Sequence, residues 1–411
     1  MEGSSYIQFD HYQDKGELKK HIFKTLHFYY PACIDEEKGG YINGFLDDGT
    51  INDTDTKHLV ATSRYIYIFS IGAILDGPDW CLEAARHGIQ FLHEHHLDKQ
   101  YNGYYFEMKG TDVKDAAKMA YGHAFTLLAS SIAYQAGIKE AREVMENVFN
   151  VVENHFWDPE HGYYKDQWDA AWTTLSSYRG QNPNMHMCEA MLTAYEATNE
   201  EKYLKKAYQL AEGVTQELAD RASGMIWENY TPDWLPDYQF NNNNTKDEFR
   251  PYGFIPGHQF EWSKLLMWLD RHQSEPWMQE TAERLFAKGW EQGWDVKYGG
   301  IYFALSPSLE VIDTDKNYWV MSEAIAAAAL LAAKTKNQQY WDYYNQLFTY
   351  SAQYFMDHEH GGWYTLLNRE NEKYSNVKNL TSQNRLPPRL SLLSIHTSSA
   401  ISQMSKEWPG L

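Results

Sequence analysis

Apolar residues recur at spacings of three and four along most of the chain, which is the period of an amphipathic helix. Six stretches show this period most clearly, and we predict helices over residues 81–97, 120–137, 140–157, 186–199, 203–222 and 323–335. Several of these stretches end at Gly or Asn followed by polar residues, which are typical helix C-caps. The pattern therefore predicts a mostly helical protein.

A short signature lies between the predicted helices: a polar stretch, then a glycine, then a pair of aromatic or apolar residues. It occurs six times, with its glycine at residues 40, 103, 162, 224, 300 and 362. The intervals between these glycines are 63, 59, 62, 76 and 62 residues, and the longest interval contains the polar insert Asn241–Arg250. Each interval has room for two helices and a hairpin, so the chain consists of six structural repeats.

Six helical pairs that each bury one face predict an all-α fold, the (α/α)6 barrel, which is a toroid of six helical hairpins. An open solenoid of six pairs would satisfy the same count. No Pro- or Ser-rich linker divides the sequence, so we predict that residues 1–411 form a single catalytic domain. In a closed ring the inner helices converge on a central cleft. Polar, ionisable or aromatic residues on apolar helix faces are then the candidate site residues.

Composition narrows the possible partners. Trp, Tyr and Phe make 16% of the chain, and Tyr and Trp suit a ligand that has both apolar and hydroxylated faces. The net charge of −20 and the absence of a basic run argue against nucleic acid and anionic membranes. Three cysteines without a C-x-x-C spacing, and an N-terminal sequence without an apolar stretch, predict a cytoplasmic protein.

Two predicted helix starts carry candidate chemistry. In the first, Gln181–Glu189, His186 and Glu189 are three residues apart and share a helix face. In the second, His258 and Glu261 have the same spacing. A carboxylate beside an imidazole fixes its tautomer and raises its pKa, which prepares an acid or base for neutral pH.

The same residues have other interpretations. On spacing alone, structural and functional roles are equally supported for the two His-x-x-Glu pairs. That spacing also occurs in helical bundles that bind two iron ions, but further Glu residues at matching positions are missing, so we predict no metal. Arg64 lies inside an apolar run and needs either a buried ion pair or a substrate. His123 belongs either to the core or beside the site, and Trp319 suits a stacking wall for a sugar.

Five segments of the sequence resemble the N-acylglucosamine 2-epimerase superfamily. They are TKHLVATSRY, YGHAF, YRGQNPNMHMCEA, FRPYGFIPGHQFEWSKLL and DTDKNYWVMSEA, which begin at residues 56, 121, 178, 249 and 313. The resemblance implies the (α/α)6 barrel and a cofactor-independent isomerase or 2-epimerase that acts on a free aldose such as D-mannose. The segment from residue 249 is most similar to the branch that contains mannose isomerases, mannose 2-epimerases and sulfoquinovose isomerases.

The resemblance also implies roles for the candidate residues. A histidine removes the proton next to the sugar carbonyl, and a cis-enediol(ate) forms. Return of the proton to C1 gives a ketose, and return to C2 on the other face gives the epimer. We predict that His258 is an acid/base supported by Glu261, and that His186 binds sugar oxygens or shares in proton transfer. The predicted substrate-binding residues, which would contact or enclose the sugar, are Arg64, Asn182, Trp319, Glu189 and His123.

The sequence departs from the family after the last repeat. The family has a segment resembling Lys-Ser-Pro-Ala-Lys-Thr-Asp-Tyr-His-Pro, whose histidine is the other catalytic base, whereas Lys378–Pro388 contains no histidine. Residues 379–388 can be encoded by the codons AAT CTC ACC AGC CAA AAC CGA TTA CCA CCC, and these codons read one base later encode Ile-Ser-Pro-Ala-Lys-Thr-Asp-Tyr-His. We therefore hypothesise that residues from about 379 to 411 are a frameshifted tail, in which His396 is the only histidine. The natural tail is expected to close the ring with a helix.

Three other functions compete with the isomerase. One is an N-acylglucosamine 2-epimerase. Another is a glycoside hydrolase on the same toroid, which needs two opposed carboxylates, but nothing in the sequence pairs Asp247, Asp313 or Asp315. A third is a non-catalytic carbohydrate-binding ring. For each of them we predict a small-molecule sugar as the ligand, with no nucleic acid or membrane partner; the pattern indicates no particular oligomeric state.

Overall fold

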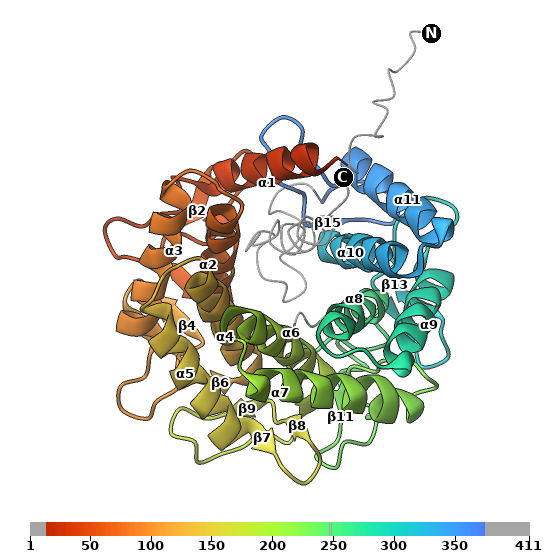
Figure 1. The fold of residues 1–411 in the computed structure, drawn as a ribbon, viewed down its shortest axis with the longest axis horizontal. Helices are drawn as coiled ribbons and strands as arrows, with labels where there is room; N and C mark the ends of the chain where they lie inside the picture. The colour runs from red at the N-terminus through yellow and green to blue at the C-terminus, as the bar shows by residue number, and fades with distance from the viewer. Residues whose placement is uncertain (1–13, 246, 248, 375–411) are drawn as a thin grey trace.

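The computed structural model describes residues 14–245, 247 and 249–374. Within these residues eleven α-helices form two concentric rings (Figure 1). The outer helices are α1 (Lys15–Tyr29), α3 (Trp80–Phe91), α5 (Ala141–Val151), α7 (Glu201–Glu212), α9 (Pro276–Gly293) and α11 (Gln338–Tyr354). The inner helices are α2 (Leu59–Ile74), α4 (Ala120–Gln135), α6 (Gln181–Thr198), α8 (Pro256–His272) and α10 (Tyr318–Thr335). The predicted (α/α)6 toroid is confirmed, while the helix expected in the tail lies outside the described residues.

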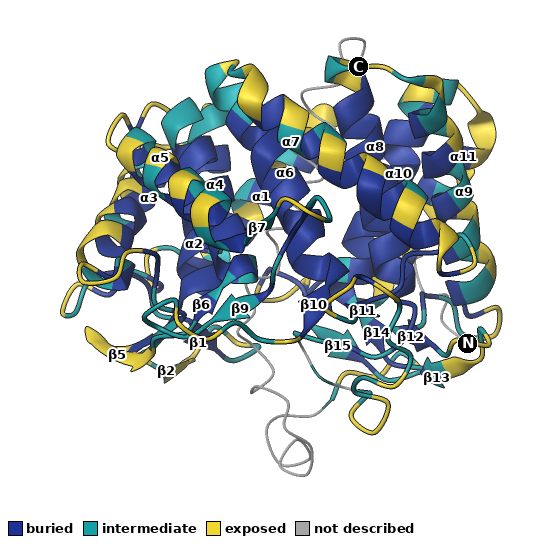
Figure 2. Ribbon diagram, turned by 90° about the horizontal axis from the view of Figure 1, so that it is seen from below, coloured by how far each residue is buried: buried dark blue, intermediate teal, exposed yellow. Residues whose placement is uncertain are grey.

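The difference between inner and outer helices follows from their sequences. Helix α8 is buried at every position from Pro256 to Asp270, because it packs against α9 outside it and against its inner neighbours. Helix α7 buries a single stripe that includes Tyr203, Leu204 and Ala207, and it exposes its charged residues (Figure 2). Three outer helices continue into π-helical turns: η2 (Leu92–His96), η3 (Val152–Phe156) and η4 (Gly213–Leu218). The continuous apolar runs therefore form the inner wall, and the amphipathic stretches cover it.

The repeated signature forms the turns at one end of the toroid. All six of its glycines have positive φ angles: Gly40 (66°), Gly103 (76°), Gly162 (82°), Gly224 (73°), Gly300 (77°) and Gly362 (75°). Side chains other than glycine are strained in this region. At Gly40 a Cβ atom would also lie 2.7 Å from the Phe91 ring. The signature is thus architectural, as its repetition predicts.

Short antiparallel strands occupy the same end (Figure 2). They are β1 (Gly44–Phe45), β2 (Ile51–Asp53), β3 (Thr56–His58), β4 (Glu107–Lys109), β5 (Asp112–Asp115), β6 (Lys118–Met119), β7 (Trp157–Asp158), β8 (Tyr163–Tyr164), β9 (Gln167–Trp168), β10 (Arg179–Gly180), β11 (Asn229–Tyr230), β12 (Ala304–Leu305), β13 (Val311–Asp313), β14 (Lys316–Asn317) and β15 (Leu366–Leu367). The pairs β3–β4, β6–β9, β10–β11 and β14–β15 each join the segment before an inner helix to the next repeat, and a Phe254–Leu305 bridge does the same before α8. All five described inner helices therefore begin at this end.

The first and last described repeats also touch each other. The indole Nε1 of Trp363 donates a hydrogen bond to Nε2 of His21 in α1, at 2.9 Å. The Lys24 ammonium, one turn further along α1, donates to the carbonyl oxygen of His358 at 3.3 Å. These contacts close the ring, so the open solenoid is excluded.

The polar insert Asn241–Arg250 reaches other repeats. The Phe249 ring lies parallel to His58, just before α2, with centroids 5.9 Å apart, and it meets Tyr121 of α4 edge-on. Arg250 donates a hydrogen bond to Asp166 at 2.8 Å. Residues of the insert therefore lie beside the first turns of the inner helices, where the predicted site residues cluster.

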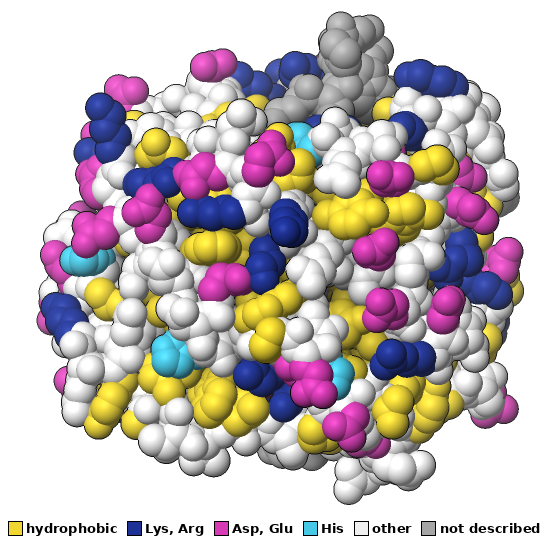
Figure 3. Space-filling view, turned by 60° about the horizontal axis from the view of Figure 1, so that its bottom comes forward, with side chains coloured by type: hydrophobic (Ala, Val, Ile, Leu, Met, Phe, Trp, Pro, Cys, Tyr) yellow, Lys and Arg dark blue, Asp and Glu magenta, His cyan; other side chains and the backbone are white. Residues whose placement is uncertain are grey.

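The apolar length of the helices and the distribution of surface charge concern two partners that the sequence argues against, membranes and nucleic acid. Among the described residues, no helix has the length and apolar character that crossing a membrane requires. On the face drawn in Figure 3, Lys and Arg side chains are interspersed with Asp and Glu and do not gather into one patch.

Candidate active site

Equivalent positions on the inner helices form one layer of the ring. Five residues after its first residue, each described inner helix places a side chain at the same level of the ring. These residues are Arg64, Phe125, His186, Glu261 and Glu323. Four of the five are ionisable, although the helices that carry them are otherwise largely apolar and buried. Such a layer of ionisable groups in a helical core is a candidate site.

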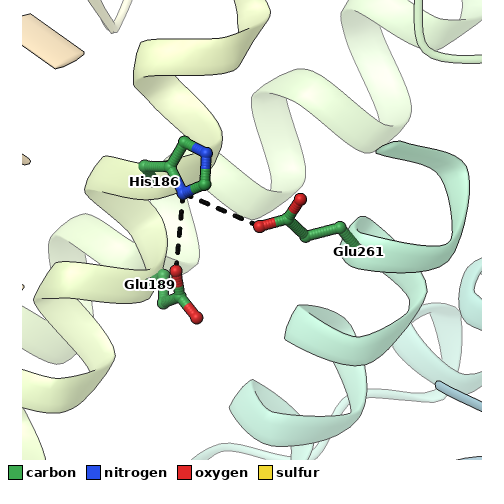
Figure 4. A group of neighbouring side chains, drawn as sticks. All are labelled: His186, Glu189 and Glu261. Atoms are coloured by element: carbon green, nitrogen blue, oxygen red, sulfur yellow. Dashed lines mark hydrogen bonds and ion pairs between the residues drawn. The ribbon is translucent and has the colours of Figure 1, made fainter. Parts of the chain in front are cut away.

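His186 lies between two carboxylates (Figure 4). Its Nδ1 is 3.5 Å from Oε2 of Glu189, one turn further along α6, and 3.6 Å from Oε1 of Glu261 on α8. All three side chains are buried. The rings of Tyr121 and Phe125 flank the imidazole, with centroid distances of 5.2 and 4.7 Å. The Glu189 carboxylate favours a proton on Nδ1, which leaves Nε2 as the acceptor.

His258 has a different partner from the one its spacing predicts. Its Nδ1 lies 2.7 Å from Oε1 of Glu228, which comes from the hairpin before β11. The predicted support from Glu261 is therefore wrong. The reason is register: His258 is two residues into α8, next to the hairpins, whereas Glu261 is one turn deeper, at the level of His186. His258 and Glu261 therefore do not pair with each other. His258 contacts Glu228 of a hairpin, and Glu261 contacts His186 of the neighbouring inner helix.

Two further side chains fix the orientation of this dyad. The Gln181 amide nitrogen lies 3.1 and 3.2 Å from the two oxygens of Glu228 and 3.0 Å from Nδ1 of His258. The Trp262 indole donates to the Gln181 carbonyl oxygen at 2.8 Å. The donors converge on Glu228, so its carboxylate accepts the Nδ1 proton of His258 and leaves Nε2 free of a proton. The ring of Trp319 stacks on His258 at 5.0 Å and 29°. His258 thus combines a fixed tautomer with an aromatic wall.

A buried lysine lies one turn below His186. The Lys264 ammonium is 3.2 Å from Oε1 of Glu189 and 2.7 Å from Oε2 of Glu323, and it thereby links α6, α8 and α10. Despite burial, the charges of these carboxylates keep the pKa of Lys264 above its ordinary value. Burial and the charge of Glu323 raise the pKa of Glu261 well above its ordinary value. The cluster therefore contains both fixed charges and a carboxyl group that retains its proton.

Arg64 and Asn182 lie beside this cluster. The Arg64 guanidinium stacks on Phe125, 4.6 Å from its centroid, and lies 3.5 Å from the Tyr121 hydroxyl. Asn182 is buried, and its carbonyl oxygen has no hydrogen-bond partner among the described residues. An unsatisfied buried acceptor is costly, which suits a position that a ligand hydroxyl completes.

Both ring nitrogens of His123 form hydrogen bonds with backbone groups. Its Nδ1 donates to the carbonyl oxygen of Met119 at 2.7 Å, and its Nε2 accepts from the amide of Tyr104 at 3.1 Å. Burial lowers the pKa of His123 to about 3. Both ring nitrogens thus hold a hairpin against α4, so we leave His123 out of the proposed site, and its role in substrate binding stays a prediction.

The His186 cluster also has the spacing of a metal site. One donor atom each from His186, Glu189 and Glu261 lies within 4.8 Å of the others. The ammonium of Lys264, however, already neutralises Glu189 from the side away from His186. We therefore do not assign these side chains as metal ligands.

Sequence reasoning missed three residues of this arrangement: Glu228, Gln181 and Lys264. Glu228 is the fourth residue after its signature glycine, a position where Glu107 and Asp166 are also acidic. Aligning the repeats would have singled it out. For Lys264 the signal is a charge inside an apolar helix, the same signal that drew attention to Arg64.

Fold and site together define an (α/α)6 toroid with histidine–carboxylate pairs on its inner helices. The chain belongs to the N-acylglucosamine 2-epimerase (GlcNAc 2-epimerase) family, whose model matches residues 39–383. It is 42% identical to the D-mannose isomerase of Marinomonas mediterranea, over 91% of this chain and 94% of the relative. It is 34% identical to the D-mannose isomerase of Thermobifida fusca, over 82% and 83%.

Solved structures agree with this assignment. A crystal structure of D-mannose isomerase superposes with a TM-score of 0.91 at 40% identity, covering 98% of this chain and all of the other. Cellobiose 2-epimerase from Spirochaeta thermophila, at 20% identity and a TM-score of 0.83, and a family 76 glycoside hydrolase from Bacteroides thetaiotaomicron, at 10% and 0.62, share the fold. The protein is a sugar isomerase or epimerase, as the sequence predicts.

Proposed function

We propose that this enzyme interconverts D-mannose and the ketose D-fructose, without a cofactor. The observation that carries the proposal is the His258–Glu228 dyad, with its 2.7 Å contact beneath Trp319. Relatives that share 42% and 34% of their residues with this chain are named D-mannose isomerase, which supports the choice of sugar.

His258 is the base in this proposal. Because its Nδ1 proton is held by Glu228, the lone pair of Nε2 is available to remove the C2 proton of the open-chain aldose. The electrons of the C2–H bond form the C1–C2 double bond, and the carbonyl oxygen becomes an enediolate oxygen. The Glu228 carboxylate stabilises the imidazolium that results. The proton of the C2 hydroxyl moves to the C1 oxygen, and return of the abstracted proton to C1 gives the ketose with its carbonyl at C2.

The surrounding groups are proposed to bind the sugar and stabilise the enediolate. Arg64 and Asn182 would donate to its oxygens, His186 would bind a hydroxyl through Nε2, and Trp319 would stack on the sugar ring. The described inner helices all begin at this end of the toroid, so the positive ends of their dipoles also favour a developing negative charge.

The charge of the site favours a neutral substrate. Lys264 is already paired with Glu189 and Glu323, and Glu261 adds a third carboxyl group. A sugar phosphate would bring about two negative charges toward this cluster. We therefore propose that phosphorylated aldoses are not substrates.

The second base is proposed to be missing from the printed sequence. The family histidine would fall after residue 378, outside the described residues, and the family match ends at residue 383, inside the hypothesised frameshift. A chain with His258 alone can exchange the C2 proton but transfers it to C1 inefficiently. We propose that restoring the reading frame restores full activity.

A cytoplasmic location completes the proposal. Cys33, Cys81 and Cys188 are all buried free thiols, which suits a reducing compartment.

Proton NMR in D2O tests the function directly. D-Mannose, D-glucose and D-fructose are incubated separately with two proteins. One has the sequence as given, and the other has the reading frame restored after residue 378 (the frame-restored chain). Deuterium at C1 of a new ketose supports the isomerase, whereas deuterium at C2 of a new aldose identifies a 2-epimerase. His258→Asn should abolish both. Absence of exchange with every aldose in the frame-restored chain would refute the proposal, and reducing ends released from an oligosaccharide would identify a hydrolase.

A further inference from the structure

The buried cluster below His186 holds more carboxyl groups than cationic partners in direct contact. Lys264 contacts Glu189 and Glu323 at 3.2 and 2.7 Å. Glu261 lies on the same helix as Lys264 but forms no ion pair with it. Its Oε1 lies 3.6 Å from Nδ1 of His186 and has no hydrogen-bond partner in the described structure. Glu261 is therefore the carboxyl group that Lys264 does not hold.

Charge balance decides where the remaining proton lies. The groups that face Glu261 are Arg64 on α2, His186 and Glu189 on α6, Lys264 on α8 and Glu323 on α10. With Glu189 and Glu323 ionised, their two negative charges balance Lys264 and Arg64. Ionising Glu261 as well would leave a net negative charge in a buried site, which is costly. Neighbouring carboxylates that share a site cannot all ionise near neutral pH.

We propose that Lys264 is a positioning residue for the isomerase: it holds Glu189 and Glu323 as carboxylates and so leaves the proton on Glu261, which faces His186 as a neutral hydrogen-bond donor. The direction of the Glu261 pKa, raised by burial and by the charge of Glu323, agrees with this assignment. The proposal rests on the proposed function only in assigning the donated hydrogen bond to a sugar oxygen.

The distances exclude a tight ion pair as an alternative. If Glu261 were ionised and His186 were an imidazolium, a charge-assisted hydrogen bond of about 2.7–2.9 Å would be expected between them. The contact is 3.6 Å, and the contact from His186 to Glu189 is 3.5 Å. Neither carboxyl group therefore forms a tight ion pair with His186.

Infrared difference spectroscopy tests the assignment at neutral pH, through the carbonyl stretch of a protonated carboxylic acid. The parent chain should show this band, and Glu261→Gln should remove it. Lys264→Met leaves one positive charge fewer, so a second carboxyl group should take up a proton and the band should grow about twofold. Lys264→Arg should keep the parent band, and the charge-compensated variant Lys264→Met/Glu323→Gln should return to it.

A control is Lys20→Met. Lys20 also pairs with a glutamate, Glu17 at 2.5 Å, but both side chains lie on the exposed face of α1, where water solvates the carboxylate without the lysine. The band should not change in this variant. A parent chain without the band, a band that survives Glu261→Gln, or nitrogen NMR showing His186 as an imidazolium would each overturn the proposal. None of these measurements needs turnover, so the result is independent of whether D-mannose is the substrate. If Lys264→Met does not fold, the spectra of the parent, Glu261→Gln and Lys264→Arg still show whether Glu261 carries the proton.

Discussion

Replacing Glu228 by Gln removes the negative charge beside His258 while keeping the size of the side chain. In the parent, Nδ1 of His258 lies 2.7 Å from Glu228, and the Gln181 amide donates to the same carboxylate. A Gln at residue 228 turns one of the two oxygens into a donor. Gln181 and the Nδ1 proton then compete for the one remaining carbonyl oxygen, and the new N–H donor favours an unprotonated Nδ1, so the tautomer of His258 is no longer fixed.

The size of the effect follows from the lost contact. A hydrogen bond to a charged group contributes about 1.5–3 kcal/mol. If this stabilisation is realised when the imidazolium forms, its loss lowers kcat/KM by about 10- to 150-fold. KM should change little, because Glu228 lies behind His258. The rate of deuterium incorporation into D-mannose measures the first effect, and nitrogen NMR of His258 measures the tautomer.

The repeats supply a control for this variant. Glu107 occupies the position equivalent to Glu228 after its own signature glycine, but it pairs with Lys114 at 2.9 Å. Glu107→Gln should therefore leave the exchange rate unchanged. If Glu228→Gln keeps both the parent rate within twofold and the Nδ1 tautomer, the role assigned to the dyad is incorrect.

Three further outcomes are expected. Restoring the reading frame after residue 378 should raise the isomerisation rate by about 10²- to 10⁴-fold, the usual contribution of one acid/base, and a gene read that supports the printed frame would refute the frameshift. Gly257→Ala would place a Cβ 2.4 Å from the Trp319 ring. This overlap should lower the free energy of unfolding by about 1–3 kcal/mol and weaken sugar binding measured by calorimetry. Gly289→Ala on α9 should leave sugar binding unchanged. Burial lowers the pKa of His58 and His123 from 6.5 to about 3 and that of His21 and His96 to about 4. The unfolded chain then binds more protons below pH 6.5, so stability should fall with falling pH, by up to about 2 kcal/mol per histidine at pH 5; equal urea midpoints at pH 7 and 5 would contradict this.

The fold was predictable because it is repeated. The glycines of the signature and the helical period recur at a nearly constant interval, and each copy supports the same interpretation of the others. All six glycines have the conformation that their position requires, and the described part of each predicted helix is helical or continues into a π-turn. Ring closure, by contrast, depends on contacts such as Trp363–His21, which no local pattern encodes.

The sequence indicated the individual residues of the candidate site but not which of them contact each other. His186, Glu189, His258 and Glu261 are all buried on inner helices, where ionisable groups need one another or a ligand. Their pairing depends on the level of each residue in the ring, and that level is fixed by where each helix begins. His186 and Glu261 are both five residues after a helix start, so they meet; His258 is two residues after one and meets a hairpin.

The contact between His21 and Trp363 has a consequence for synthesis of the protein. These residues are 342 positions apart in the chain. At the usual speed of about 5–20 residues per second, a ribosome needs roughly 20–70 s to travel from one to the other. During that time α1 has no last repeat to dock against, and the apolar side it will bury there stays uncovered. A chaperone that binds the nascent chain would therefore have many seconds in which the first helix is the segment to shield.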